Sequence, residues 1–123
     1  MLQLTFKVAA NPQPMRRIAL VRQEGYPDNE ISFGKVPIVA TGENLQMGAG
    51  DTLKLELYED GEPVAVLDRL QSIVSTPTAI SFVITGNSSS RTDGEWAGKT
   101  VLLTATIGGE EVRHWLRFYD HEA

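Results

Sequence analysis

The side chains that most often carry out chemistry in proteins are scarce in this chain. It has no cysteine and only two histidines, His114 and His121. This excludes a thiolate nucleophile, a disulfide, a thiolate metal site and a three-histidine metal centre. A catalytic triad would have to use one of the two histidines, but His114 is in register with apolar residues of an expected strand and His121 belongs to the terminal segment. We therefore expect a protein that is not an enzyme.

Six carboxylates could be ligands of a hard cation such as Ca²⁺, which takes six or more oxygen ligands. No Asp-x-Asp-x-Asp spacing links them, so we interpret them as solvated surface and expect no metal and no cofactor. They are Asp93, Glu95, Glu110, Glu111, Asp120 and Glu122.

The segment from Gly94 to Thr100 has the outline of a phosphate-binding loop. Three residues separate Gly94 from Gly98, whereas that motif needs four between its glycines. The segment also leads into an expected strand, whereas a phosphate loop opens a helix whose N–H groups hold the anion. We therefore do not expect nucleotide binding.

The last expected strand, residues 112–119, has an alternating stripe of cationic and aromatic side chains. The opposite face has Val112, Leu116 and Phe118, and if these are buried the stripe is exposed, as binding surfaces often are. The alternation alone also allows the inverted assignment, with Trp115 in the core. The candidate interaction residues of the stripe are Arg113, Trp115, Arg117 and Tyr119.

Arg16 and Arg17 are the other candidate interaction residues. They follow two prolines, and residues 9–17 are expected to be an extended arm or a connection between strands. Residues 1–41 have five basic and three acidic groups, a net charge of +2, whereas residues 42–123 have six and thirteen, a net charge of −7. The two arginines could therefore pair with an acidic surface, including one on another copy of the chain.

Apolar and polar residues alternate with a period of two along most of the sequence, which predicts half-buried antiparallel strands. Asp60-Gly61 and Gly108-Gly109 predict tight hairpin turns. Pro37 indicates an edge strand or a bulge, and residues 68–74 are the best but too short helical candidate. The expected strands cover residues 2–8, 18–23, 30–33, 36–40, 53–58, 64–67, 80–85, 101–107 and 112–119.

These elements predict the fold class and the domain organisation. Many short strands separated by Gly, Pro, Asn and Asp, with almost no helix, are typical of an all-β protein. We predict an antiparallel Ig-like β-sandwich of eight or nine strands, formed as a single domain by residues 1–123. The polar tract 86–94 is expected to remain an unordered loop.

Composition narrows the choice of partners. The formal net charge of −5 is unsuited to a broad nucleic-acid surface. No apolar run reaches the length of a membrane span, and the first residues alternate where a signal peptide would be continuously apolar. We therefore expect no nucleic acid, no membrane and no secretion signal.

A resemblance to a known class of domains follows from two parts of the chain. Residues 50–64 and the hairpin from 98 to 118 resemble strands of the small Ig-like domains in tailed-phage virion proteins, including capsid decoration and tail accessory proteins. The resemblance implies a non-catalytic virion subunit that docks on capsid or tail proteins or on copies of itself. The alternative is a carbohydrate-binding module in which Trp96, Trp115 or Tyr119 stacks on sugar rings.

Overall fold

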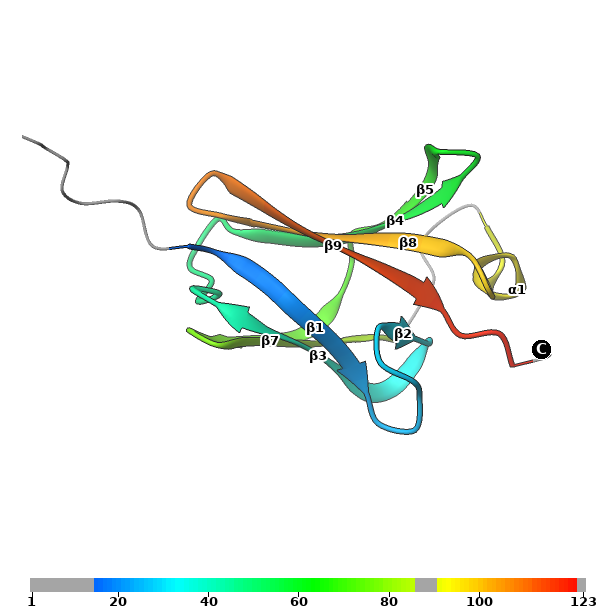
Figure 1. The fold of residues 1–123 in the computed structure, drawn as a ribbon, viewed down its shortest axis with the longest axis horizontal. Coiled ribbons are helices and arrows are strands. Elements are labelled where there is room, and N and C mark those ends of the chain that lie inside the picture. The colour runs from blue at the N-terminus through cyan, green and yellow to red at the C-terminus, as the bar shows by residue number, and fades with distance from the viewer. Residues whose placement is uncertain (1–14, 86–90, 122–123) are drawn as a thin grey trace, which may run out of the picture.

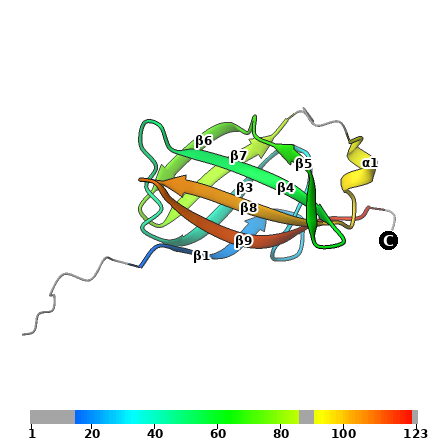
Figure 2. The ribbon, with the colours of Figure 1, turned by 90° about the horizontal axis from the view of Figure 1, so that it is seen from above.

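The computed structural model describes residues 15–85 and 91–121 and shows an all-β sandwich (Figures 1 and 2). One sheet has four strands in the order β1-β3-β7-β6, and the other has five in the order β2-β9-β8-β4-β5. The strands in this part of the chain are β1 (Arg17–Gln23), β2 (Glu30–Ile31), β3 (Gly34–Glu43), β4 (Thr52–Glu59), β5 (Glu62–Leu67), β6 (Gln71–Thr76), β7 (Ala79–Ile84), β8 (Thr100–Ile107) and β9 (Glu110–Phe118).

The alternation in the sequence determines which side chains enter the core between the sheets. In β4, Leu53, Leu55 and Leu57 are buried, and the residues between them are less buried and face outward. The two predicted hairpins are present, and Asp60 and Gly61 have φ values of 52° and 80°. Two consecutive positive φ values are the geometry of the turn that suits the right-handed twist of paired strands.

The short strand β2 closes one side of the sandwich. It follows β1 in the chain and pairs in parallel with β9 of the other sheet. The N–H of Asn29 donates to the carbonyl of Val21 in β1 at 2.7 Å, and the N–H of Arg117 in β9 donates to the carbonyl of Asn29 at 3.0 Å. The order β1-β3-β7-β6 in one sheet and β4-β8-β9 in the other is the strand order of Ig-type sandwiches. The predicted fold class is therefore confirmed, and among the described strands the pair of β2 and β9 is the exception to antiparallel pairing.

A four-residue helix, α1 (Asp93–Trp96), covers one end of the sandwich (Figure 1). The side chain of Glu95 accepts a hydrogen bond from the N–H of Thr92 at 2.8 Å, which stabilises the first turn. Trp96 at the end of the helix has no exposed surface and its ring lies 5.3 Å from that of Phe118. This helix therefore completes the core.

The structure settles several local expectations. Residues 68–74, too short to be predicted as a helix, include the start of the edge strand β6 at Gln71. Of the two settings predicted for Pro37, the bulge is confirmed, because Pro37 lies in the inner strand β3, whose register shifts between Gly34 and Ile38. Within the expected loop 86–94, Asp93 begins α1, whereas residues 86–90 lie outside the described residues, and the strand expected at 30–33 ends at Ile31. The strand expected at 2–8 lies outside the described residues.

Candidate functional site

The structure decides which face of β9 is buried. Val112, Leu116 and Phe118 are in the core, whereas the side chain of Trp115 is 54 per cent exposed. Trp115 therefore lies on the outward side of the five-stranded sheet, here called the outer face, which Figure 2 views from above. The inverted assignment, with Trp115 in the core, is wrong.

Trp115 does not stand alone on the outer face. The ring of Tyr58 in β4 lies 5.0 Å from that of Trp115, with an angle of 79° between the planes. Since β8 lies between β4 and β9, the two rings meet above β8. Tyr58 was not among the predicted site residues, although the burial of Leu53, Leu55 and Leu57 by alternation would have placed it on the outer face.

Two arginines flank Trp115 on the same strand. Arg113 pairs with the carboxylate of Glu111, and Arg117 donates to the carbonyl of Gly98 at 3.3 Å. Both guanidinium groups remain largely exposed. We refer to Tyr58, Arg113, Trp115 and Arg117 together as the outer-face patch.

A shallow cavity of about 400 Å³, the outer-face pocket, lies beside the patch. Its floor comes from β8, where Leu102 and Thr104 point away from the core yet are 5 and 2 per cent exposed. The Oγ1 atom of Thr104 is buried and has no hydrogen-bond partner among the described residues. The lining consists of Lys54, Glu56, Tyr58, Leu102, Thr104, Glu111, Arg113 and Trp115.

The remaining predicted interaction residues lie elsewhere. Tyr119 follows the end of β9 and its ring lies 5.1 Å from that of Tyr26, so it is not part of the stripe above β8. Arg16 is engaged within the domain, with its guanidinium 2.6 Å from Glu110 and bound to the carbonyl of Asn44 at 2.8 Å. Arg17 begins β1 and forms an exposed pair with Glu43 at 3.4 Å.

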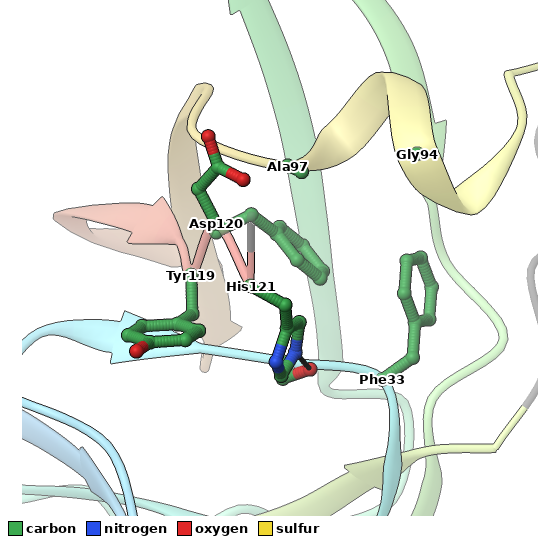
Figure 3. Close-up of a pocket in the computed structure, with 8 residues that line it drawn as sticks. Phe33, Gly94, Ala97, Tyr119, Asp120 and His121 are labelled. Atoms are coloured by element: carbon green, nitrogen blue, oxygen red, sulfur yellow. Dashed lines mark hydrogen bonds between the residues drawn. The ribbon is translucent and has the colours of Figure 1, made fainter. Parts of the chain in front are cut away.

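A second cavity, the end pocket, lies beneath α1 (Figure 3). It contains a contact that resembles part of a catalytic triad, because Nε2 of His121 lies 3.2 Å from Oγ of the buried residue Ser32. Figure 3 shows that Asp120 points away from the ring of His121, so this carboxylate does not orient the imidazole. A serine and histidine without an orienting acid lack the arrangement that activates a nucleophile.

His114 connects the two sheets at the closed side of the sandwich. Its Nε2 lies 2.8 Å from Oδ1 of Asn29, and the same oxygen accepts the N–H of Val21 at 3.0 Å. Since an amide oxygen only accepts, the imidazole nitrogen is the donor. Burial lowers the pKa of His114 below its ordinary value, and a hydrogen bond to the backbone of Ile18 partly opposes that shift. These contacts give His114 a structural role.

The carboxylates considered as cation ligands do not gather at one place in the part of the chain that the structure describes. Glu110 and Glu111 pair with arginines near the β8–β9 turn, whereas Glu95 caps α1 at the other end. The hydrogen bonds from the backbone and side chain of Thr92 lower the pKa of Glu95. In the described ranges, no group of three or more His, Asp or Glu side chains is placed to hold a metal ion.

Comparisons with known proteins add no family to this description. No family model, no curated protein and no solved structure matches the chain. Within residues 15–85 and 91–121, no helix has the length and apolar character needed to span a membrane.

Proposed function

We propose that this protein is a non-catalytic docking subunit that binds a larger assembly through the outer-face patch. The observation that supports this most directly is Trp115, half exposed and in contact with Tyr58. Trp, Tyr and Arg are the side chains that dominate binding at the centres of protein interfaces. An exposed aromatic pair with an arginine on each side of the tryptophan has this composition.

The position of the patch on a sheet also favours binding. Tyr58 and Trp115 project from strands whose opposite faces bury Leu57 and Leu116 in the core. Side chains on such a rigid support lose little backbone freedom when a partner binds, which reduces the entropic cost of association.

The resemblance to Ig-like domains of tailed-phage virion proteins makes a virion accessory subunit the specific form of this proposal. The partner is then a protein of the particle, either a capsid or tail protein or another copy of this chain. A role of this kind needs no catalytic residues and no cofactor.

The proposal is tested by co-sedimentation of the purified protein with virions from its source, together with light scattering of the protein alone. We expect binding that Trp115→Ala and Arg117→Ala weaken, while Val74→Ala, an exposed substitution on β6 of the other sheet, leaves it unchanged. The proposal would be contradicted if the protein is a monomer that does not co-sediment with virions. It would also be contradicted if Trp115→Ala leaves co-sedimentation unchanged.

A further inference from the structure

The outer-face pocket has walls and a floor that follow from the strand register. Lys54 and Arg113 stand on either side of Thr104, because both pair with it across the sheet. In the neighbouring row of residues that face outward across the sheet, Glu56 and Trp115 lie on either side of Leu102. Tyr58 meets Trp115 above β8 and closes one end. The pocket is therefore a short trough, and its volume lies within the range of roughly 300–1,000 Å³ seen for small-molecule sites.

The floor of the trough has an unsatisfied polar group. Buried hydroxyl groups almost always have a hydrogen-bond partner, because leaving one unpaired destabilises the folded protein. The hydroxyl of Thr104 has none among the described residues and lies between the stems of two long, partly exposed side chains. Thr104 lines the outer-face pocket, so a ligand bound there lies next to a hydroxyl that can donate or accept a hydrogen bond.

The charges around the trough already balance. Nζ of Lys54 lies 3.8 Å from the carboxylate of Glu56 two residues along β4, and Arg113 pairs with Glu111 two residues along β9. Two cations and two carboxylates leave no net charge for an ionic ligand to neutralise. A neutral ligand with several hydroxyl groups can use the same side chains as donors and acceptors without separating their charges.

The aromatic end of the trough adds a requirement for apolar surface. Trp115 is exposed beside the polar side chains that line the pocket. A ligand with hydroxyl groups along its edges and C–H groups on its faces matches both the polar side chains and the aromatic ring. A sugar ring has this structure. We infer that the outer-face pocket binds a pyranose unit of a neutral glycan, with Trp115 packing on the ring and Thr104 bonding a sugar hydroxyl.

This inference goes beyond the proposed function and shares with it only the use of the outer face as a contact surface. It is tested by calorimetric titration of the full chain with maltohexaose, cellohexaose, xylohexaose and mannohexaose as neutral probes and hexagalacturonate as an anionic probe. We expect at least one neutral hexasaccharide to bind more tightly than hexagalacturonate. Binding of no neutral probe, or tighter binding of the anionic one, would overturn the inference.

Two variants connect binding to the named atoms. Trp115→Ala should abolish glycan binding, and Thr104→Val should weaken it roughly 2- to 12-fold, the value of one hydrogen bond. The matched control is Thr100→Val, the same change at an exposed position of β8 outside the pocket lining. Equal effects of Thr100→Val and Thr104→Val would overturn the role of Thr104. Each variant is first shown by thermal unfolding to retain the fold.

The outcomes also separate this inference from the docking proposal. If Trp115→Ala abolishes co-sedimentation with virions and no neutral glycan binds, the inference fails and docking stands. If Trp115→Ala abolishes glycan binding and leaves co-sedimentation unchanged, docking through the patch fails and the inference stands. Both fail if Trp115→Ala changes neither.

Discussion

The two tryptophans of this protein lie in opposite environments. Trp96 has no exposed surface and packs at the end of the core, with its ring centroid 6.2 Å from that of Phe33. Trp115 is 54 per cent exposed and contacts Tyr58 on the outer face. The same residue type therefore stabilises the fold in one region and is available for binding in the other. Burial, which depends on tertiary structure, makes the difference.

The largest expected effect is that of Trp96→Ala. Removing a fully buried tryptophan creates a cavity at the end of the sandwich and should reduce the free energy of unfolding by about 3–5 kcal/mol. Urea denaturation followed by circular dichroism measures this change. A loss below about 1 kcal/mol, the size expected of many surface substitutions, would show that Trp96 does not stabilise the fold more than Trp115 does.

An intermediate effect is expected from acid acting on His114. Because burial lowers the pKa of His114 in the folded state, the unfolded chain binds the proton more readily around the ordinary histidine pKa of 6.5. Stability is therefore complete above this pH and decreases as the pH falls below it. Thermal unfolding at pH 7.5 and pH 5.5 should show this loss, and His114→Gln should reduce it. An unchanged pH dependence in His114→Gln would show that another group is responsible.

A smaller effect of opposite sign is expected at Thr104. Thr104→Val replaces a buried hydroxyl without a described partner by a methyl group of similar size, so stability should rise by up to about 1 kcal/mol. The measurement is the midpoint of urea unfolding, compared with that of Thr100→Val. A clear loss of stability would mean that the hydroxyl is satisfied in the folded protein.

The smallest expected effect on stability is that of Trp115→Ala. An exposed side chain loses little packing when it is truncated, and the free energy of unfolding should change by less than about 1 kcal/mol. Urea denaturation beside Trp96→Ala gives the contrast directly. A loss comparable to that of Trp96→Ala would show that Trp115 supports the fold and would weaken its assignment to a binding surface.

Much of the fold was predictable because its strands have one buried and one exposed face. The alternation of Leu53, Leu55 and Leu57 and the turn at Gly108-Gly109 each encode local structure directly. The edge strand β6 was missed because its residues from Gln71 to Val74 are exposed on both faces, so no period of two is required. Helix α1 was missed because a single turn is too short to show a helical period, although Thr92 and Glu95 have the spacing of a capping box.

The candidate site was less predictable than the fold. Alternation placed Arg113, Trp115 and Arg117 together on one face, but it did not decide whether that face was buried. Tyr58 and Thr104 reach the same site through pairing of β4, β8 and β9, which depends on register between strands distant in the sequence. Tyr119 was assigned to the stripe because alternation was extended one residue beyond Phe118, where β9 ends.

The closed side of the sandwich has a mechanical consequence. Arg16 fixes the start of β1 near the β8–β9 turn, whereas β9 ends at Phe118 at the opposite end of the sandwich (Figure 1). Tension applied between these points runs along β1 and β9 and acts as shear on the hydrogen bonds through Asn29 that join them. Bonds under shear must break together, whereas bonds at the tip of a hairpin break one by one. This geometry suits a domain that transmits force along its long axis.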